Sequence, residues 1–527
     1  MKTRTAPPTG RRSSPDQLRA PYADALLAHA GRDWLRLNVP GHAAASGSGL
    51  AAAFGTRVPA LDFPPLLDGL DLGAHTPLDE ARELAARAWG ARRTWFLTNG
   101  ASQGNQIASM VTPALGRTLV VQRSVHSSVA DGLVLSGLRA VFVHPSVDPG
   151  QGIAHGVTAE EVRGALERTP DAAAVYVVSP SYFGAVADVR ALADAAHAAG
   201  VPLIVDEAWG SHFGFHPALP EGALALGADL VTSSTHKLGG SLTQSAMLHL
   251  AEGPFADRLE PLVDRAFRLV QSTSASALLT ASLDLTRRAL VTGADRIAGS
   301  VEAADRIRAA VRAQGRFGVV SDGFHRFPDI TATDPLRIAL DTRAGGITGH
   351  EARRLLFRDH RVMVEVATDA AIVAVVGAGS SPDADRFVEA LHRLPAPLGG
   401  SDAGWGPRSG SESGSESGSG PRSGSGSGPG SGVAGRAPLR LPRPGPARLT
   451  AREAFLSPAR VVPAEEAVGM VSADTLAAYP PGIPNVLPGE VITSEAVEFL
   501  RRTAAAPGGH VRGALDPDVS RLRVVAP

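Results

Sequence analysis

The sequence predicts an α/β fold built on a mainly parallel sheet. Two observations support this prediction. Unbroken apolar runs of strand length recur between residues 83 and 237, and stretches with helical periodicity separate them. Strands that are buried on both faces read as continuous Val/Ile/Leu runs, whereas a sheet with one solvated face alternates polar and apolar residues. We therefore expect helices on both faces of the sheet.

The helical and strand-like stretches alternate in a regular order. ELAARAWG precedes TWFLTN, and SQGNQIASMVTPAL precedes TLVVQ and AVFVHP. AEEVRGALER then leads to AAVYVVSP, VRALADAAHAAG leads to VPLIVDEA, and a last run reads DLVTSSTHK. We expect these stretches to form a major domain over residues 19–284, together with the segment that precedes them. Residues 1–18, rich in charge and proline, are expected to be a disordered tail.

Two further units are expected after the major domain. Residues 285–398 begin with a long Arg/Ala-rich helical stretch and continue with the strand-like PLRIALDT and VMVEVATDAAIVAVV around HEARRLLFRDH, which predicts a small α+β domain. Residues 399–446 consist mainly of Gly, Ser and Pro and are expected to be a flexible linker, because they cannot bury enough apolar surface to fold. Patterned sequence resumes over residues 447–527, which predicts a C-terminal α+β domain.

Composition narrows the classes of function. The 527 residues carry a formal net charge of -1 and no block of like charges, which argues against binding to nucleic acid or to an anionic membrane. The absence of cysteine excludes disulfides, zinc–thiolate sites and thiol nucleophiles. No apolar run has the length of a signal peptide or a membrane span. We expect a cytoplasmic enzyme with a small-molecule substrate.

The lysine content points to one residue. The 51 Lys and Arg residues include only two lysines, Lys2 and Lys237, so a lysine retained in the interior suggests chemistry that arginine cannot perform. Lys237 follows an apolar strand, where parallel sheets place residues that face ligands. A shielded lysine can form a Schiff base, because burial lowers its pKa. We interpret Lys237 as the attachment point of pyridoxal 5′-phosphate (PLP).

Asp206 provides a second candidate, at the end of the run VPLIVDEA. A carboxylate at the end of a buried strand needs a partner, and the pyridine nitrogen of PLP is a suitable one. A helix cap or a metal ligand is the alternative interpretation. Ala208 lies two residues further on and would face the same side, where a small side chain leaves room for a flat ring.

The segment TWFLTNGASQGNQ combines a strand, a turn of small residues and the start of a helix. Backbone amides at such a helix start can bind phosphate, and Ala101, Ser102 and Gln103 are the expected donors. The letters from Gly100 to Gly104 also match the G-x-S-x-G turn of α/β hydrolases, with Ser102 as nucleophile. That alternative leaves Lys237 without a role.

Histidines near these segments are further candidates. His126 in RSVHSSVADGL follows the next strand and could stack on the PLP ring and transfer protons, although a structural loop histidine is the plain alternative. Ser234 and His236 precede Lys237 and could contact the phosphate. His212 and His216 have i, i+4 spacing but no acidic third ligand at a suitable position, so no metal site is expected.

The ordered motifs resemble the bacterial Orn/Lys/Arg decarboxylases of PLP fold type I, whose major domain has an aminotransferase-like fold. The resemblance runs through VPGH (39–42), GLDLGAHTPLDEARELAARAWGA, TNGASQGNQ, RSVHSSVADGLVLSG, PSYFGAVADV, VDEAWGSHFGFH, STHKLGGSLTQSAMLH and STSASALLTASLD. It resumes after the linker with SPARVVPAEEAVGMVSADTLAAYPPGIPNVLPGEVIT and GGHVRGALDP. Most of the chain outside the tail and linker is covered.

The resemblance implies roles that agree with those inferred from the residues. It implies Lys237 as the Schiff-base lysine, Asp206 at the pyridine nitrogen and His126 on the ring face. Phosphate contacts are implied for the set Ala101, Ser102, Ser234 and His236. The chain departs from the family pattern at Ala43, Ala101, Ala275 and Trp209, and in its long Gly/Ser segment. These departures remove no catalytic group, but they leave the choice of substrate open.

The implied reaction is decarboxylation of lysine, ornithine or arginine to cadaverine, putrescine or agmatine, a step of polyamine metabolism. We expect Glu466 in PAEEAVG, with Glu465 next, to bind the distal cation of the substrate, although both could lie on an exposed helix. A PLP-dependent aminotransferase is the alternative within the cofactor class. A Ser102 hydrolase and a binding protein without catalysis are the alternatives outside it. The family also implies a homodimer or larger homo-oligomer, in which residues 73–77 could face the partner's cofactor.

Overall fold

A computed structural model describes residues 15–395, 441–479, 482–506 and 509–526. Its largest sheet has seven strands in the order β1-β10-β9-β8-β6-β2-β3. The strands are β1 (Arg93–Leu97), β2 (Thr118–Gln122), β3 (Arg139–Val143), β6 (Ala172–Val178), β8 (Leu203–Asp206), β9 (Leu230–Ser233) and β10 (Ala246–Leu250). Strands β3, β2, β6, β8 and β9 are parallel, and β10 is antiparallel to both β9 and β1. The predicted mainly parallel sheet is therefore confirmed.

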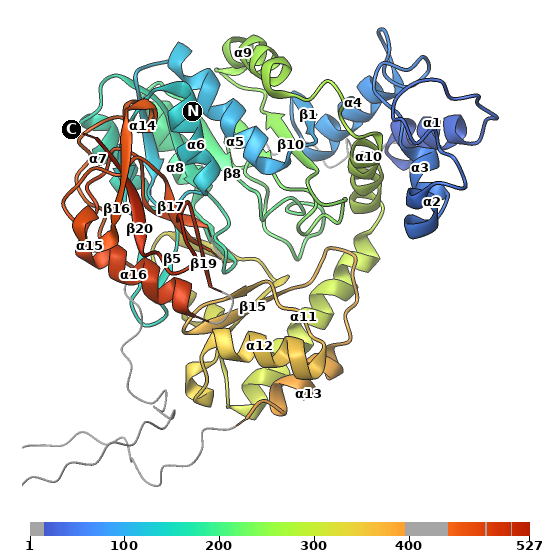
Figure 1. Ribbon diagram of the computed structural model, residues 1–527. Coiled ribbons are helices and arrows are strands. Elements are labelled where there is room, and N and C mark those ends of the chain that lie inside the picture. Colours follow the sequence, from blue (N-terminus) through green and yellow to red (C-terminus); the bar gives the residue numbers. More distant parts are fainter. Residues whose placement is uncertain (1–14, 396–440, 480–481, 507–508, 527) are drawn as a thin grey trace, which may run out of the picture.

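Helices cover both faces of this sheet (Figure 1). Neighbouring residues of β2 show the two layers, because successive side chains of a strand point to opposite faces. Leu119 and Val121 pack in one apolar cluster, and Val120 packs in another. The first cluster contains α5 (Gly100–Val111), α6 (Ser127–Ser136) and α9 (Ala256–Val270), and the second contains α7 (Ala159–Glu167) and α8 (Val189–Ala198).

Helix α5 lies close to the sheet at one glycine. A Cβ atom at Gly104 would come within 2.6 Å of the Cγ2 atom of Thr232 on β9. No larger residue fits there without moving the helix away from the strand. Gly104 therefore determines how closely the N-terminal part of α5 packs against the sheet.

A smaller unit follows the major sheet. Its four-stranded antiparallel sheet has the order β11-β13-β15-β14, and α11 (Ala294–Gln314), α12 (Gly349–His360) and α13 (Ala384–His392) pack with it. The strands are β11 (Gly318–Val319), β13 (Arg337–Asp341), β14 (Val366–Ala367) and β15 (Ala371–Val375). Strand β12 (Ile330–Thr333) pairs with β7 (Ala185–Ala187) and joins the two units. The boundary expected after residue 284 falls inside α10 (Ala277–Val291), a continuous helix.

The C-terminal part folds around its own apolar cluster. Its elements are α14 (Ala451–Leu456), α15 (Ala464–Ala467), α16 (Ser494–Ala505), β16 (Ala459–Pro463), β17 (Leu476–Tyr479), β18 (Ile483–Val486), β19 (His510–Arg512) and β20 (Arg521–Val525). Strand β16 pairs with β20, and β17 pairs with β18 and β19. Most of the expected linker, residues 399–440, lies outside the described residues.

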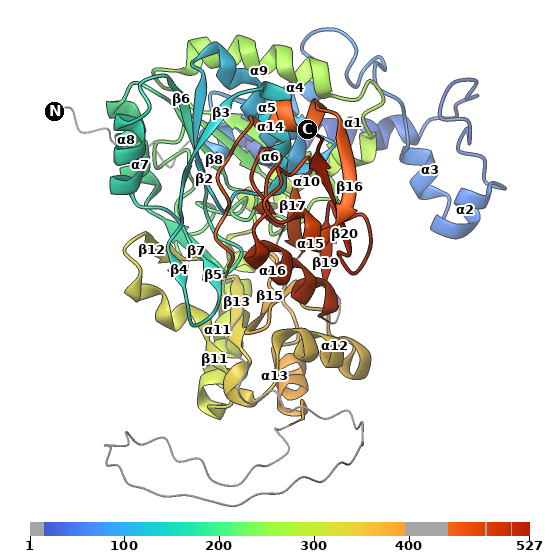
Figure 2. The same cartoon turned by 60° about the vertical axis from the view of Figure 1, so that its left-hand side comes forward.

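The C-terminal part packs on the major unit, as Figure 2 shows from a second side. Arg123, after β2, donates to the carbonyl oxygens of Pro484 and Asn485 at 2.6 and 3.3 Å. The same guanidinium pairs with the Glu490 carboxylate at 3.0 Å, and both side chains are buried. Since a buried charge requires partners, this contact holds the two parts in one arrangement.

The N-terminal segment begins with the short helix η2 (Pro15–Leu18) and with α1 (Pro21–Ala30), which pack against α4 (Pro77–Trp89) and α10. It continues into an arm that contains α2 (Gly49–Phe54) and α3 (Arg57–Leu61) and extends from the body in both views (Figures 1 and 2). Gln17 is fully buried and donates to the Leu84 carbonyl oxygen at 3.1 Å. The expected disordered tail 1–18 is therefore too long by residues 15–18, and residues 1–14 lie outside the described residues.

Candidate active site

A cavity of about 270 Å³ lies at the carboxyl ends of the parallel strands. This volume is close to the lower end of the range for small-molecule sites, roughly 300–1,000 Å³. The edge where parallel strands end is where such sheets bind ligands. The lining residues are Gly100, Ala101, Ser102, Asn105, His126, Val178, Tyr182, Asp206, Ala208, Trp209, Ser234, His236, Lys237, Glu365 and Val366. The structure thus brings together all the predicted cofactor residues except Gln103.

Lys237 lies four residues beyond the end of β9, with part of its side chain accessible to the cavity. Its Nζ atom is 3.7 Å from the centre of the Trp209 ring. Burial lowers the pKa of Lys237 to about 8, and the nearby Asp206 carboxylate opposes that shift. A pKa so close to neutrality leaves part of the amine unprotonated, so Lys237 can act as a nucleophile near neutral pH.

Asp206 ends β8 and is only 2% exposed. Its Oδ1 atom accepts a hydrogen bond from the Ala208 backbone at 3.0 Å, and Oδ2 accepts one from Asn105 Nδ2 at 2.8 Å. Burial raises the pKa of Asp206, against the effects of Lys237 and of these two donors. A cationic partner in the cavity would favour the ionised form of this carboxylate.

His126 is the N-cap residue of α6. Its Nδ1 atom accepts from the Ser128 backbone N–H at 3.2 Å and lies 2.8 Å from the Ser128 hydroxyl oxygen. Burial, with the nearby cations Lys237 and Arg512, lowers the pKa of His126 to about 3. The ring is therefore neutral across the physiological range, with the lone pair on Nδ1 and the proton on Nε2.

The residues expected to bind phosphate have different surroundings. Ala101 and Ser102, in the first turn of α5, line the cavity, where the free backbone N–H groups of a helix start are available to an anion. His236 donates from Nδ1 to the Ser245 carbonyl oxygen at 3.0 Å, which leaves Nε2 as the acceptor in the neutral ring. Gln103 does not line the cavity, because its side chain donates to Gln271 at 2.8 Å.

Trp209 separates the cavity from a buried arginine that the sequence did not reveal. The Cζ atom of Arg337, on β13, is 3.7 Å from the centre of the Trp209 ring. Arg337 donates to the Tyr182 carbonyl oxygen at 2.6 Å, and burial lowers its pKa to about 10. The departure from the family pattern at Trp209 therefore places an aromatic face beside two cationic side chains.

The acidic substrate candidates and the spaced histidines lie outside this cavity. Glu466 is exposed on α15 and does not line the cavity in this chain, and its neighbour Glu465 pairs with Arg501 at 2.5 Å. His212 is buried and pairs with Asp334 at 3.1 Å, whereas the Nδ1 atom of His216 accepts from the Ala218 backbone. Across the described ranges, no group of three or more His, Cys, Asp or Glu side chains is arranged to hold a metal ion.

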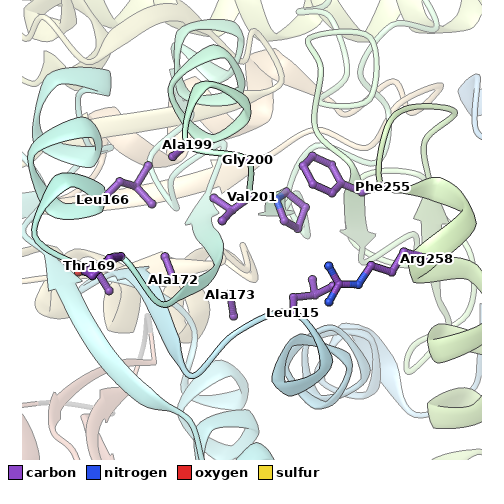
Figure 3. A pocket seen from close by; sticks show the side chains of 12 residues that line it. Leu115, Leu166, Thr169, Ala172, Ala173, Ala199, Gly200, Val201, Phe255 and Arg258 are labelled. Carbon is purple, nitrogen blue, oxygen red and sulfur yellow. The ribbon is translucent and has the colours of Figure 1, made fainter.

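A second cavity, of about 280 Å³, lies at the opposite ends of β6 and β8 (Figure 3). Most of the residues that line it have apolar side chains, and Arg258 is the one charged residue among the described residues that line it. Figure 3 shows the Arg258 guanidinium extending toward Leu115. These lining residues offer no acid–base pair. Among the described helices, none is both long enough and apolar enough to cross a membrane.

The side chains of the first cavity are suited to PLP. The cofactor has an aldehyde, a pyridine nitrogen, a flat ring and a phosphate. Lys237 offers an amine, Asp206 a buried carboxylate, and His126 and Ala208 offer a flat and a small side chain. The carboxylate of Asp206 is the strongest indication. It accepts hydrogen bonds from two neutral donors, and no cationic side chain among the described residues is hydrogen-bonded to it.

Sequence profiles and curated proteins give matches to one family. The profile of the Orn/Lys/Arg decarboxylase major domain matches residues 20–323, and that of the C-terminal domain matches residues 446–508. The arginine decarboxylase of Halalkalibacterium halodurans is 33% identical over 97% of this chain and 98% of that protein. The arginine decarboxylase of Bacillus subtilis is 31% identical over the same shares of the two chains.

Solved structures give the same fold. The lysine decarboxylase of Francisella novicida is 18% identical with a TM-score of 0.75, covering 97% of this chain and 82% of that chain. Lysine decarboxylase A of Pseudomonas aeruginosa is 21% identical with a TM-score of 0.75, covering 97% of this chain and 81% of that one. The expected fold class, with its separate C-terminal domain, is thus confirmed.

Proposed function

This chain belongs to the Orn/Lys/Arg decarboxylase family, and from that premise we propose that it decarboxylates a basic amino acid with PLP held at Lys237. That the chain is a decarboxylase follows from its matches over nearly the full length to arginine decarboxylases. The observation that carries the cofactor proposal is a lysine of lowered pKa in one cavity with the buried carboxylate of Asp206.

Each residue has a defined task in the proposed reaction. Lys237 would hold PLP covalently, Asp206 would pair with its pyridine nitrogen, and His126 would cover its ring. The first turn of α5 and the Ser234 hydroxyl would bind the phosphate, and His236 would contact it through a protonated Nε2. When bound, PLP supplies an electron sink for the bond to the departing carboxyl group. The Nζ atom of Lys237 would then deliver the proton that replaces carbon dioxide, whereas His126, as a neutral ring, would keep its Nε2 proton.

We infer that Glu365 binds the distal cation of the substrate. Among the described residues, the acids that line the cavity are Asp206 and Glu365, and the proposed role of Asp206 is at the cofactor. Glu365 is exposed, so it lies where the cavity meets solvent. The negative charge of its carboxylate raises the pKa values of both Lys237 and Arg337. The charge of Glu365 therefore acts on groups inside the site. A cationic substrate suits this charge, whereas a neutral amino acid would leave it unpaired.

Arginine is the proposed first substrate, because relatives that match nearly the full chain are named arginine decarboxylases. A lysine decarboxylase from Hafnia alvei matches over only 47% of this chain. Purified protein with added PLP is expected to release carbon dioxide from arginine faster than from lysine or ornithine, without a keto acid. A requirement for a keto acid would instead identify an aminotransferase.

The same assay distinguishes Glu365 from Glu466. Glu365→Gln is expected to raise KM for the preferred basic amino acid by about tenfold, as expected for the loss of one charged pair of roughly 1.4 kcal/mol, with kcat little changed. Glu466→Gln is expected to leave KM unchanged if the residues of one chain alone form the substrate site. A rise in KM for Glu466→Gln alone would restore Glu466 as the substrate residue.

We propose a homodimer whose interface includes the N-terminal arm. Apolar side chains on the arm are unusually exposed: Leu35 by 87%, Leu37 by 89% and Phe54 by 66%. Exposed apolar groups gathered on one projecting segment are typical of an interface. Light scattering is expected to give twice the mass of the chain, and Leu37→Glu is expected to shift the protein toward monomer. A monomeric wild-type protein would contradict this proposal. That residues 73–77 face the partner's site remains a prediction.

A further inference from the structure

The side chains of Asn105 and Ser128 form a continuous hydrogen-bonded path between Asp206 and His126. Asn105 Nδ2 donates to Asp206 Oδ2 at 2.8 Å and to the Ser128 hydroxyl oxygen at 2.9 Å. The Ser128 hydroxyl lies 2.8 Å from His126 Nδ1. The Tyr176 hydroxyl donates to Asn105 Oδ1 at 2.9 Å and completes the amide's contacts.

The path has a direction, which Asp206 sets. An ionised carboxylate only accepts hydrogen bonds, so Asn105 must turn its NH₂ group toward Asp206. The second hydrogen of that NH₂ group then points at the Ser128 oxygen. The Ser128 hydroxyl accordingly uses its own hydrogen to donate to His126 Nδ1. That nitrogen already accepts from the Ser128 backbone, so its lone pair is occupied and the ring proton lies on Nε2.

We propose that Asn105 and Ser128 are positioning residues that couple the ionisation of Asp206 to the tautomer and basicity of His126. When Asp206 is ionised, His126 is held as a neutral ring with its proton on Nε2. When Asp206 is neutral, Asn105 can turn its oxygen toward Asp206 and Ser128. Ser128 then donates to Asn105, and its oxygen becomes available to accept from a protonated Nδ1, which must give up the hydrogen bond from the Ser128 backbone N–H. This inference concerns the protein's own side chains and stands whether or not PLP binds.

Burial makes the path well defined. Asn105 and Ser128 are each 1% exposed, and Tyr176 is fully buried, so bulk water does not compete for these contacts. Helices α5 and α6 pack directly on one another and carry Asn105 and Ser128 on their facing sides. An unmade hydrogen bond at such depth is costly, which favours the fully paired arrangement.

Other charged groups near His126 also affect its pKa, and their effects must be distinguished from that of the hydrogen-bonded path. Lys237 after β9 and Arg512 on β19 both lower the pKa of His126. Arg512 in turn pairs with Asp131 of α6 at 3.0 Å and contacts the Ser127 hydroxyl. The direct charge of Asp206 acts in the opposite sense, since a nearby carboxylate favours the protonated imidazole. Removing that charge alone would lower the pKa of His126.

This difference in sign allows a decisive experiment. The pKa of His126 can be measured from the exchange of its C2 hydrogen for deuterium, followed by mass spectrometry of its peptide. The measurement is made on the protein as purified and again after treatment to remove any PLP. We expect Ser128→Ala to raise the pKa of His126 by about 0.5–1 unit, the scale of one lost hydrogen bond. Asp206→Asn is also expected to raise it, although the direct charge effect predicts a decrease.

Two comparisons complete the design. In an Asn105→Leu background, Asp206→Asn is expected to lose its raising effect on His126, because the path is already broken. Ser109→Ala removes another buried hydroxyl of α5, one that donates to the Asn105 backbone oxygen at 2.9 Å, and should leave the pKa of His126 unchanged. A decrease or no change in Asp206→Asn would overturn the proposal, as would an unchanged pKa in Ser128→Ala. Carbon dioxide release plays no part in this readout, so failure of the proposed function would be seen separately.

Discussion

Replacing Lys237 with alanine is expected to reduce decarboxylation by about 10³-fold or more, the scale on which loss of a covalent catalytic group acts. Lys237→Arg should be equally inactive, because a guanidinium stays protonated and cannot attack a carbonyl carbon. The measurement is carbon dioxide release from the preferred basic amino acid with saturating PLP. Loss of the visible absorption of bound PLP in both variants would link the effect to cofactor attachment.

The chain itself offers a matched control for Lys237. It contains only one other lysine, Lys2, and Lys2→Arg is expected to retain full activity. Borohydride treatment of the PLP-loaded protein should add the cofactor's mass to the peptide that carries Lys237. With two lysines in 527 residues, the modified site can be assigned without ambiguity. Modification at Lys2 alone, or activity in Lys237→Ala, would contradict the proposal.

Asp206→Asn is expected to lower kcat by about 10²–10³-fold, the effect of removing one preorganised electrostatic partner. The asparagine keeps nearly the same shape but cannot hold a proton on the pyridine nitrogen of PLP by its charge. The variant is expected to bind PLP and to lose turnover, which steady-state kinetics and cofactor titration separate. Wild-type kcat in Asp206→Asn would exclude the role proposed for this carboxylate.

Glu207 is the control for this substitution, because it is the adjacent buried acid and does not line the cavity. Burial raises the pKa of Glu207 to about 8, against the hydrogen bond it accepts from the Ala223 backbone at 2.7 Å. At neutral pH this side chain is therefore mostly protonated, and glutamine resembles that form in shape and charge. Glu207→Gln should retain kcat close to the wild-type value.

The apolar runs and the residues at their ends could be predicted from the sequence because both follow from local pattern. The run TLVVQ coincides with β2, all of whose residues are buried. Asp206 ends one strand and Lys237 follows the neighbouring parallel strand, so the order of the sheet brings both to the same edge. His126 follows the same logic, because β2 ends at Gln122 and the next helix begins at Ser127.

Glu365, Asn105 and Ser128 escaped prediction for different reasons. Glu365 comes from the edge of the small sheet, beside β14, and only the packing of that unit against the major one brings it to Lys237. Asn105 and Ser128 lie within helices, where their orientation depends on the contact between α5 and α6. One signal was available: Asn105 is a polar residue beside Gly104 on the apolar side of a helix. The side chain of Gln103 turns toward Gln271 and away from the cavity. A phosphate contact through the backbone N–H of Gln103 stays a prediction.

The buried pair between Arg123 and Glu490 has a consequence for when the chain can complete its folding during synthesis. Arg123 leaves the ribosome 367 residues before Glu490 and 361 before Pro484. At a synthesis rate of about 5–20 residues per second, its guanidinium waits roughly 20–70 s for its partners. During that interval the surface after β2 must stay hydrated, since the cation cannot be buried alone. The nascent major unit therefore completes its packing only when nearly the whole chain has been translated.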